Sequence, residues 1–340
     1  MPHLAAFIEA PRTPFVLKEV ETAQPGSDDL LVRNELIGLV PVDAKIAKYA
    51  ALPVPYPYVL GLSFGGTVTA VGSAVTKFQV GDRVAVAKPT SVGNNYSPFQ
   101  QFVLAKEAYT AKVPASADLH GPVGTVGNIT TVIGLLSGTI GLQRPDLSRP
   151  TTRLGKKVLI YGGTSSFGTI AIQYLTQAGY DVVTTTSPKN RELTSQLGAT
   201  QVIDHTQDAE IVREALLAAG PYENIVDAIS LPNTVNITAA VLSTQGGGTL
   251  YTLTPPMGPE NIPGNVERRF HAWPTVLEEE KNADLLKWSL GGYYQQALAE
   301  NRLIHLPAVK IDGGLKGLEK ACDVLDKGVS ATKVVVDPWE

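Results

Sequence analysis

A glycine-rich segment between an apolar run and a helical pattern is the clearest candidate for chemistry in the sequence. The apolar run at 158–161 is typical of a strand buried on both faces, and apolar residues recur at helical spacing from Phe167 to Ala178. Where glycines lead a strand into a helix, backbone N–H groups and the helix N-terminus can approach a pyrophosphate. The connecting residues are Gly162-Gly163-Thr164-Ser165-Ser166-Phe167-Gly168.

Two of the three glycines of the dinucleotide-binding pattern G-x-G-x-x-G are present. Gly163 and Gly168 match the first and third, and Ser165 occupies the middle position. Ser165 and Ser166 could cap the helix or donate their hydroxyls to phosphate. The alternative is an ordinary strand-to-helix turn, but the flanking strand and helix favour cofactor binding. We predict contacts to a dinucleotide from Gly163, Thr164, Ser165, Ser166 and Phe167.

The residues after the second strand of this region indicate which nicotinamide cofactor is bound. NAD-binding units place an acid near the end of that strand, where it holds the ribose 2′-hydroxyl. Here the strand ends Thr185-Thr186-Ser187, and Lys189 and Arg191 follow. Hydroxyls and cations suit a 2′-phosphate, and the missing carboxylate removes a source of repulsion. We therefore predict NADPH, bound by Ser187, Lys189 and Arg191; the alternative is that both cations only open a solvated helix.

Strands and helices alternate through the middle of the chain, which predicts a doubly wound parallel sheet. Further strands are expected at 180–186, 201–204, 224–229, 248–253 and about 269–273. The flanking parts consist mostly of short strands and turns, with helices expected at 284–298 and 315–326 and a closing strand at 332–336. The predicted fold class is therefore α/β, with a Rossmann domain over 126–274 inserted into a mostly β catalytic domain formed by 1–125 and 275–340.

Composition excludes several other classes of protein. The chain has 340 residues, 18% of them charged, and a net charge of −4, and no Lys/Arg stripe is present, so nucleic acid is an unexpected partner. We see no signal peptide and no apolar run long enough to span a membrane. The single cysteine, Cys322, cannot form an intrachain disulfide or a cysteine zinc cluster. These features predict a cytoplasmic enzyme.

Several segments, taken together, resemble the medium-chain dehydrogenase/reductase superfamily. The resemblance covers nearly the whole chain and rests on 38–45 (GLVPVDAK), 60–68 (LGLSFGGTV), 81–84 (GDRV), the glycine-rich turn and 329–336 (VSATKVVV). Within the superfamily the chain is most similar to quinone oxidoreductases and to the fungal trans-acting enoyl reductases that serve polyketide synthases. The resemblance implies that the mostly β domain has a GroES-like fold.

The sequence departs from the zinc-binding members of this superfamily. They carry Cys where Val40 or Pro41 stands and a His-Glu pair near Leu62 and Ser63. The histidines, at 3, 120, 205, 271 and 305, show no metal-ligand spacing. We therefore expect no metal site. Without a Lewis acid, reduction of an isolated carbonyl loses its usual electrophile, whereas a conjugated C=C can accept hydride at its β-carbon and leave an enolate.

The resemblance also implies roles for individual residues. It places Pro41, Asp43 and Lys45 at the nicotinamide, and Lys45 could steady the enolate, contact the cofactor or be an ordinary surface lysine. Tyr49 could donate the proton or serve packing, and Thr131 could contact the nicotinamide ribose or be a capping or buried threonine. His205 could lie at the adenine or the 2′-phosphate, or in solvent. Leu253 and Lys333 complete the predicted cofactor-binding residues.

Three hypotheses for function follow. The first is an NADPH-dependent enoyl reductase acting on an α,β-unsaturated thioester, either free or tethered to a carrier protein, with a polyketide synthase as partner. The second is an oxidoreductase of free quinones or enones. The third is a non-catalytic NADPH-binding accessory protein. The expected strand at 269–273 could pair across a homodimer, and a monomer is the alternative.

Overall fold

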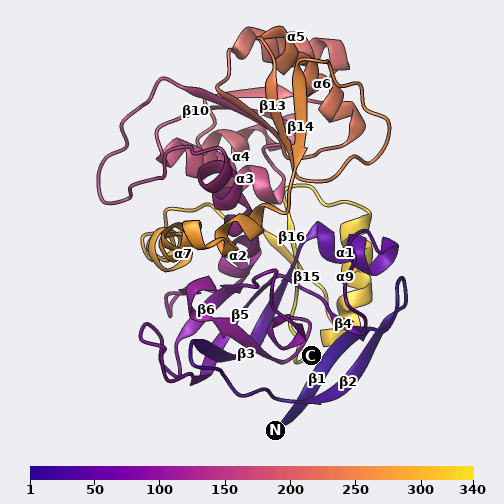
Figure 1. Ribbon diagram of the computed structural model, residues 1–340, viewed down its shortest axis with the longest axis vertical. Coiled ribbons are helices and arrows are strands. Elements are labelled where there is room, and N and C mark those ends of the chain that lie inside the picture. Colours follow the sequence, from indigo (N-terminus) through magenta and orange to yellow (C-terminus); the bar gives the residue numbers. More distant parts are fainter. The chain divides into compact units, whose positions relative to one another are not determined.

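The computed structural model describes all residues, Met1–Glu340, which divide into two compact units (Figure 1). Unit 1 comprises Met1–Thr130 and Leu277–Glu340, and unit 2 comprises Thr131–Val276. These boundaries lie a few residues from those expected at 125 and 275. The helix α2 (His120–Ile133) contains the end of the first segment of unit 1 and the start of unit 2.

Unit 1 is built mainly of strands. Its smaller sheet has the order β2 (Phe15–Glu21), β1 (Pro2–Ile8) and β4 (Tyr58–Val59). Its larger sheet has the order β15 (Ala308–Lys310), β16 (Lys333–Val336), β3 (Asp29–Leu39), β5 (Ser63–Val71), β6 (Arg83–Ala87) and β8 (Thr110–Lys112), with β7 (Phe102–Lys106) also paired to β3.

The strand register gathers four residues at one end of the larger sheet. Val334 pairs with Leu39, Gly38 with Ser63, and Ser63 with Ala87. The residues directly beyond these pairs therefore lie at the same end of the sheet. They are Lys333, Val40, Leu62 and Lys88.

Helices of unit 1 come from both segments of the chain. The helix α1 (Pro41–Tyr49) follows β3 directly, and its interior residues pack with those of α9 (Leu318–Asp326) in one apolar core. The helix expected at 284–298 is α7 (Ala283–Trp288), a π-helical turn (Ser289–Tyr294) and α8 (Gln295–Ala299). The wide turn contains Gly291 and Gly292, whose conformational freedom suits a local departure from α geometry.

Unit 2 is a six-stranded parallel sheet with helices between its strands. The sheet order is β11 (Gln201–Asp204), β10 (Asp181–Thr186), β9 (Lys157–Tyr161), β12 (Asn224–Asp227), β13 (Gly248–Thr252) and β14 (Val266–Phe270). The connecting helices are α3 (Ser166–Gln177), α4 (Arg191–Gln196), α5 (Ala209–Ala219) and α6 (Pro232–Thr244). The order reverses at β9, which is the Rossmann arrangement, and ligands of such sheets bind outside the carboxyl ends of the strands at that point.

Two strand ends differ from expectation for local reasons. The strand expected at 224–229 ends at Asp227, because the Asp227 carboxylate accepts the N–H groups of Ile229 and Ser230 at 2.9 and 2.8 Å and turns the chain. The last strand is displaced toward the N-terminus, since Trp273 begins a short 3-10 helix and its indole N–H donates to Thr252 O at 2.8 Å.

Candidate functional site

The glycine-rich turn of unit 2 leads β9 into α3 through tightly packed backbone. Gly162 has φ +92°, a conformation that glycine adopts without strain. A Cβ at Gly163 would lie 2.4 Å from Thr184 Oγ1, and one at Gly168 would lie 2.2 Å from Gly162 O. The two matched glycines therefore let the turn close against its own sheet, and the first-turn amides of α3 have no preceding carbonyl within the helix to bond. This backbone fits a pyrophosphate.

Ser165 acts as the N-cap of α3. Its Oγ accepts from Gly168 N at 2.9 Å and donates to Gly162 O at 2.8 Å. Of the two roles considered for this hydroxyl, the structure therefore shows the capping one. Phe167 is 2% exposed, so its side chain packs inside the fold. Thr164 Oγ1 lies 3.2 Å from Thr186 Oγ1, which brings these hydroxyls to the carboxyl end of β10.

Two cations follow β10 without an acidic partner. Lys189 and Arg191 are exposed, and neither forms an ion pair. Asp204, at the end of the neighbouring β11, accepts from Thr206 and Gln207, and these hydrogen bonds keep its pKa below the usual value. His205 is exposed, and its backbone N–H donates to Thr186 O at 3.2 Å. The cationic surface predicted for a 2′-phosphate is thus present, with one carboxylate nearby that is tied into its own loop.

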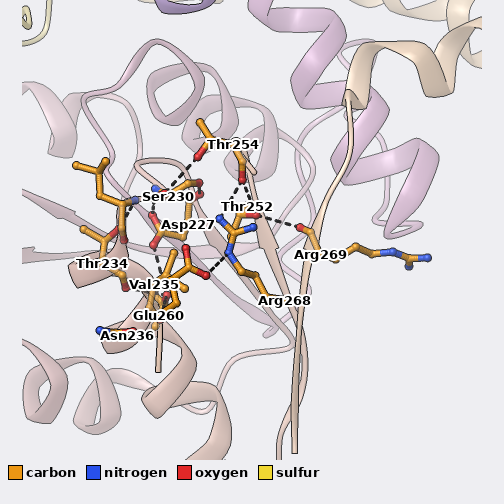
Figure 2. Close-up of polar contacts among 12 residues, drawn as sticks. Asp227, Ser230, Thr234, Val235, Asn236, Thr252, Thr254, Glu260, Arg268 and Arg269 are labelled. Atoms are coloured by element: carbon orange, nitrogen blue, oxygen red, sulfur yellow. Dashed lines mark hydrogen bonds and ion pairs between the residues drawn. The ribbon is translucent and has the colours of Figure 1, made fainter. Parts of the chain in front are cut away.

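A buried polar network holds the backbone of Leu253, one of the predicted cofactor-binding residues. Figure 2 shows Asp227 and Ser230 of this network. Ser230 is fully buried with φ +58°, a strained conformation for a residue other than glycine. Its Oγ donates to Asp227 O at 2.7 Å and accepts from Leu253 N at 2.8 Å. Burial raises the pKa of Asp227, although the N–H groups of Ser230 and Ile229 oppose this rise. Since the Leu253 amide is already bonded, only its carbonyl or side chain remains for a cofactor.

The loop after Leu253 is fixed by a buried ion pair, also drawn in Figure 2. Arg268 Nε lies 2.7 Å from Glu260 Oε2, and both side chains are less than one tenth exposed. The same guanidinium donates to Thr254 O at 3.0 Å. The segment between β13 and β14 is therefore held near its start, at Thr254, and in its middle, at Glu260.

In unit 1, the predicted cofactor residues Pro41, Asp43 and Lys45 lie on the first turns of α1. Pro41 is exposed at the first helical position, where its missing N–H costs nothing. Asp43 is 1% exposed, and its carboxylate accepts from Val40 N at 2.9 Å, which caps the helix. Lys45 is half-buried and forms no ion pair. An uncommitted ammonium next to a fixed helix start can bind an anionic group.

Three buried charges surround the start of α1. Burial raises the pKa of the Asp43 carboxyl to about 7, although the Val40 amide and the ammonium groups of Lys88 and Lys333 favour its charged form. Burial lowers the pKa of Lys333 to about 8, and the nearby Asp43 opposes this shift. Lys333 is 4% exposed and its stem passes Gly124, where a Cβ would lie 3.1 Å from Lys333 Cγ. The ammonium groups of Lys88 and Lys333 thus both act on the carboxyl group of Asp43, and all three residues are buried.

The remaining predicted catalytic residues have different surroundings. Tyr49 is 53% exposed, and its hydroxyl donates to Asp326 of α9 at 2.8 Å, beside a pair between Lys48 and Asp323. Thr131 is half-buried on α2, in unit 2, whereas its neighbour Thr130 donates to Gly127 O at 3.0 Å. The catalytic roles of Tyr49 and Thr131 remain predictions.

Lys88 and Tyr58 form a contact that the sequence analysis missed. Lys88 is 6% exposed, and its Nζ donates to the Tyr58 hydroxyl at 2.8 Å. The available signal was a lysine directly after the buried strand β6 and before a proline, a place where a long cationic chain must find a partner inside the fold.

Three further findings do not involve the predicted site residues. A hollow of about 320 Å³ in unit 1 is bordered by Lys77, Lys112, Lys287 and Glu107, and none of the predicted residues lines it. No cluster of three His, Cys, Asp or Glu side chains that could hold a metal is present. In addition, no helix has both the length and the hydrophobicity needed to cross a membrane.

The fold of the two units and the predicted site residues in each of them indicate the class of protein. Residues 26–115 match the family model described as the alcohol dehydrogenase GroES-like domain. The remaining domain is the Rossmann sheet, and the chain belongs to the medium-chain dehydrogenase/reductase family of oxidoreductases.

Among its relatives, the chain is 32% identical to the dehydrogenase azaJ of Aspergillus niger, with 98% of each protein covered. It is 30% identical to the trans-enoyl reductase himH of Aspergillus japonicus, with 91% of this chain and 89% of that protein covered. Its fold is similar to that of the mycobacterial protein Rv1454c complexed with NADPH, with a TM-score of 0.75, 23% identity and coverage of 99% and 100% of the two chains.

Proposed function

We propose that the protein is an NADPH-dependent, zinc-independent enoyl reductase that acts on an α,β-unsaturated thioester of the polyketide type. The observation that carries this proposal is the alignment with a trans-enoyl reductase over 91% of the chain, at 30% identity. The substrate is free or carrier-tethered, and the reaction takes place in the cytoplasm with a polyketide synthase as partner.

Features of unit 2 support NADPH as the cofactor. The turn from β9 to α3 would hold the pyrophosphate through its backbone amides. Lys189 and Arg191 would contact the 2′-phosphate, and neither forms an ion pair within the protein. The solved complex of the similar Rv1454c fold contains NADPH. Bound NADPH supplies the hydride.

Features of unit 1 support reduction of a conjugated double bond. The positions that hold zinc in other members of the superfamily carry Val40, Pro41, Leu62 and Ser63, which are not zinc ligands. These residues would not hold the metal ion that polarises an isolated carbonyl. Lys45 would stabilise the negative charge that develops on the thioester oxygen when the β-carbon accepts hydride. The Asp43 cap holds the turn of α1 from which Lys45 projects.

The proposal is tested by following NADPH oxidation with the metal-free protein and three sets of acceptors: enoyl thioesters, simple enones and quinones. Enoyl thioesters should have the highest kcat/KM, without stimulation by added zinc. Turnover of quinones alone would contradict the substrate class, and dependence on zinc would contradict the metal-free mechanism. Binding of NADPH without turnover of any acceptor would contradict an enzymatic function.

A further inference from the structure

The proposed reduction requires a proton as well as a hydride, and the tyrosine first considered for that step is engaged elsewhere. Tyr49 donates its proton to Asp326. Tyr58, in the same unit, has different surroundings. Its oxygen accepts from the buried ammonium of Lys88 at 2.8 Å, and its own proton is donated to no protein group. Tyr58 is also half-buried, so part of this residue is open to solvent.

The backbone on both sides of Tyr58 is fixed. Asn94 Oδ1 accepts from Val59 N at 3.0 Å, and Asn94 Nδ2 donates to Pro57 O at 3.1 Å. Lys88 is anchored as well, because its backbone N–H donates to Leu62 O at 2.9 Å. Two short segments of unit 1 therefore present the tyrosine and the lysine to each other in one geometry.

The pairing suits transfer of the tyrosine proton. An ammonium has three N–H donors, and Lys88 uses one of them on Tyr58. A cation that donates to a phenol oxygen stabilises the negative charge left when the phenol proton departs, and it does so most strongly where water is excluded. The ammonium also lies 5.0 Å from the centre of the Tyr58 ring, so it remains close if the ring turns slightly.

The pair lies beside the helix that carries Lys45. Tyr58 and Val42 of α1 pack against the same apolar core. The charge of Lys88 acts on Asp43, which caps α1. The sheet register agrees with this proximity, since Ala87, Ser63 and Gly38 form one paired row, and Lys88 follows Ala87 while Val40 lies two residues after Gly38.

We propose that Tyr58 is the proton donor of the reaction and that Lys88 activates it. This inference rests on the proposed function. In the step, a C–H bond forms at the substrate β-carbon from the hydride, and the nicotinamide that gives it is oxidised. The π electrons move toward the thioester oxygen, the Tyr58 O–H bond breaks, and its proton forms the new C–H bond at the α-carbon. Lys88 stabilises the phenolate, which solvent then reprotonates.

The test compares Tyr58→Phe, Lys88→Met and the double variant with the unmodified protein, on whichever acceptor that protein reduces. Each single variant should lower kcat by roughly 100- to 10,000-fold, the usual range for general acid catalysis, while KM and the NADPH dissociation constant change less than about threefold. The double variant should lose no more than about the worse single one, because the two residues act as a unit. Tyr109→Phe is the control, since Tyr109 is buried in the same unit and its hydroxyl has no partner.

A second readout separates proton donation from a structural role. In deuterated water the unmodified protein should place solvent deuterium at one face of the α-carbon, and Tyr58→Phe should lose that facial selectivity. A kcat within about twofold of the unmodified protein for Tyr58→Phe, or retained selectivity, would overturn the assignment. If the unmodified protein reduces enones but no thioester, only the substrate class fails and the tyrosine is tested on the enone. If it reduces nothing, both proposals fail.

Discussion

Asp43 and Lys333 are an acidic and a basic side chain that are both buried in unit 1. Burial penalises the charged form of each, so the pKa of Asp43 rises to about 7 and that of Lys333 falls to about 8. Chains retain such costly groups more often at sites of function than in ordinary cores. The cluster therefore supports the prediction that the start of α1 belongs to a functional site.

Asp43 makes stability depend on pH in a defined direction. Between about pH 4 and 7 the folded protein holds a proton on Asp43 that the unfolded chain has released, so the free energy of unfolding should fall as pH rises through this window. The slope reaches at most about 1.4 kcal/mol per pH unit. Urea unfolding at about pH 5, 6 and 7 should show this decline in the unmodified protein and lose its Asp43 component in Asp43→Asn. Equal slopes for the two proteins would contradict the buried titration.

Lys189 tests the choice of cofactor. Lys189→Ala should raise the dissociation constant of NADPH roughly 10- to 100-fold, because a charge-assisted hydrogen bond to phosphate is lost. The NADH dissociation constant, measured in the same fluorescence titration, should stay unchanged and serves as the control. An equal rise for both cofactors would remove Lys189 from the 2′-phosphate site.

Sequence patterns reveal some site residues and hide others. The glycine turn could be predicted because strand, turn and helix are contiguous in the chain. Ser165 left two roles open, and only its distances to Gly162 and Gly168 identify it as a cap. The Tyr58–Lys88 contact and the Ser230–Leu253 bond join residues far apart in sequence, and no local pattern specifies such pairs.

At the scale of elements, α2 shows how glycine sets the distance between a helix and a sheet. Gly121, Gly124 and Gly127 recur every three residues, so they share one face. A Cβ added to them would meet His305, Lys333 and Ser63, respectively. The glycine face lets α2 lie close to the end of β5 and to the stem of Lys333, which helps to bury the charge cluster.

Gly127→Ala should destabilise the protein, because its Cβ would lie 2.0 Å from Ser63 Oγ. Overpacking of this kind costs about 1–3 kcal/mol. Adding Ser63→Ala should restore most of the loss, since the next contact, with Ser63 Cβ, is 3.3 Å. Thermal unfolding of both single variants and the double variant measures the coupling. If the losses of stability in the two single variants simply add up in the double variant, residue 127 of α2 makes no steric contact with Ser63.

Elements with strong periodicity were predictable, and those shaped by distant contacts were not. The strands β9, β10, β11 and β13 lie close to where apolar runs predict them. The strand β14 is displaced because the indole of Trp273 bonds to Thr252, a tertiary contact. The π-helical turn at Ser289–Tyr294 interrupts a stretch whose periodicity predicts one continuous helix.

At the scale of the whole molecule, each unit holds residues that the proposed reaction would use. Unit 2 holds the glycine turn and the cations after β10, and unit 1 holds Lys45, the buried charge cluster and the Tyr58–Lys88 pair. The relatives match across nearly the full chain, so the family assignment covers both units. We predict that these parts reduce a conjugated double bond and leave the carbonyl intact.

That claim is tested most directly by locating the hydride in the product. The protein is supplied with an α,β-unsaturated thioester and NADPH deuterated at its transferable position, and the product is examined by mass spectrometry and NMR. We expect one deuterium on the β-carbon and none on the carbonyl carbon. Deuterium on a carbinol carbon would mean that the protein reduces the carbonyl instead, and would contradict the proposed reaction.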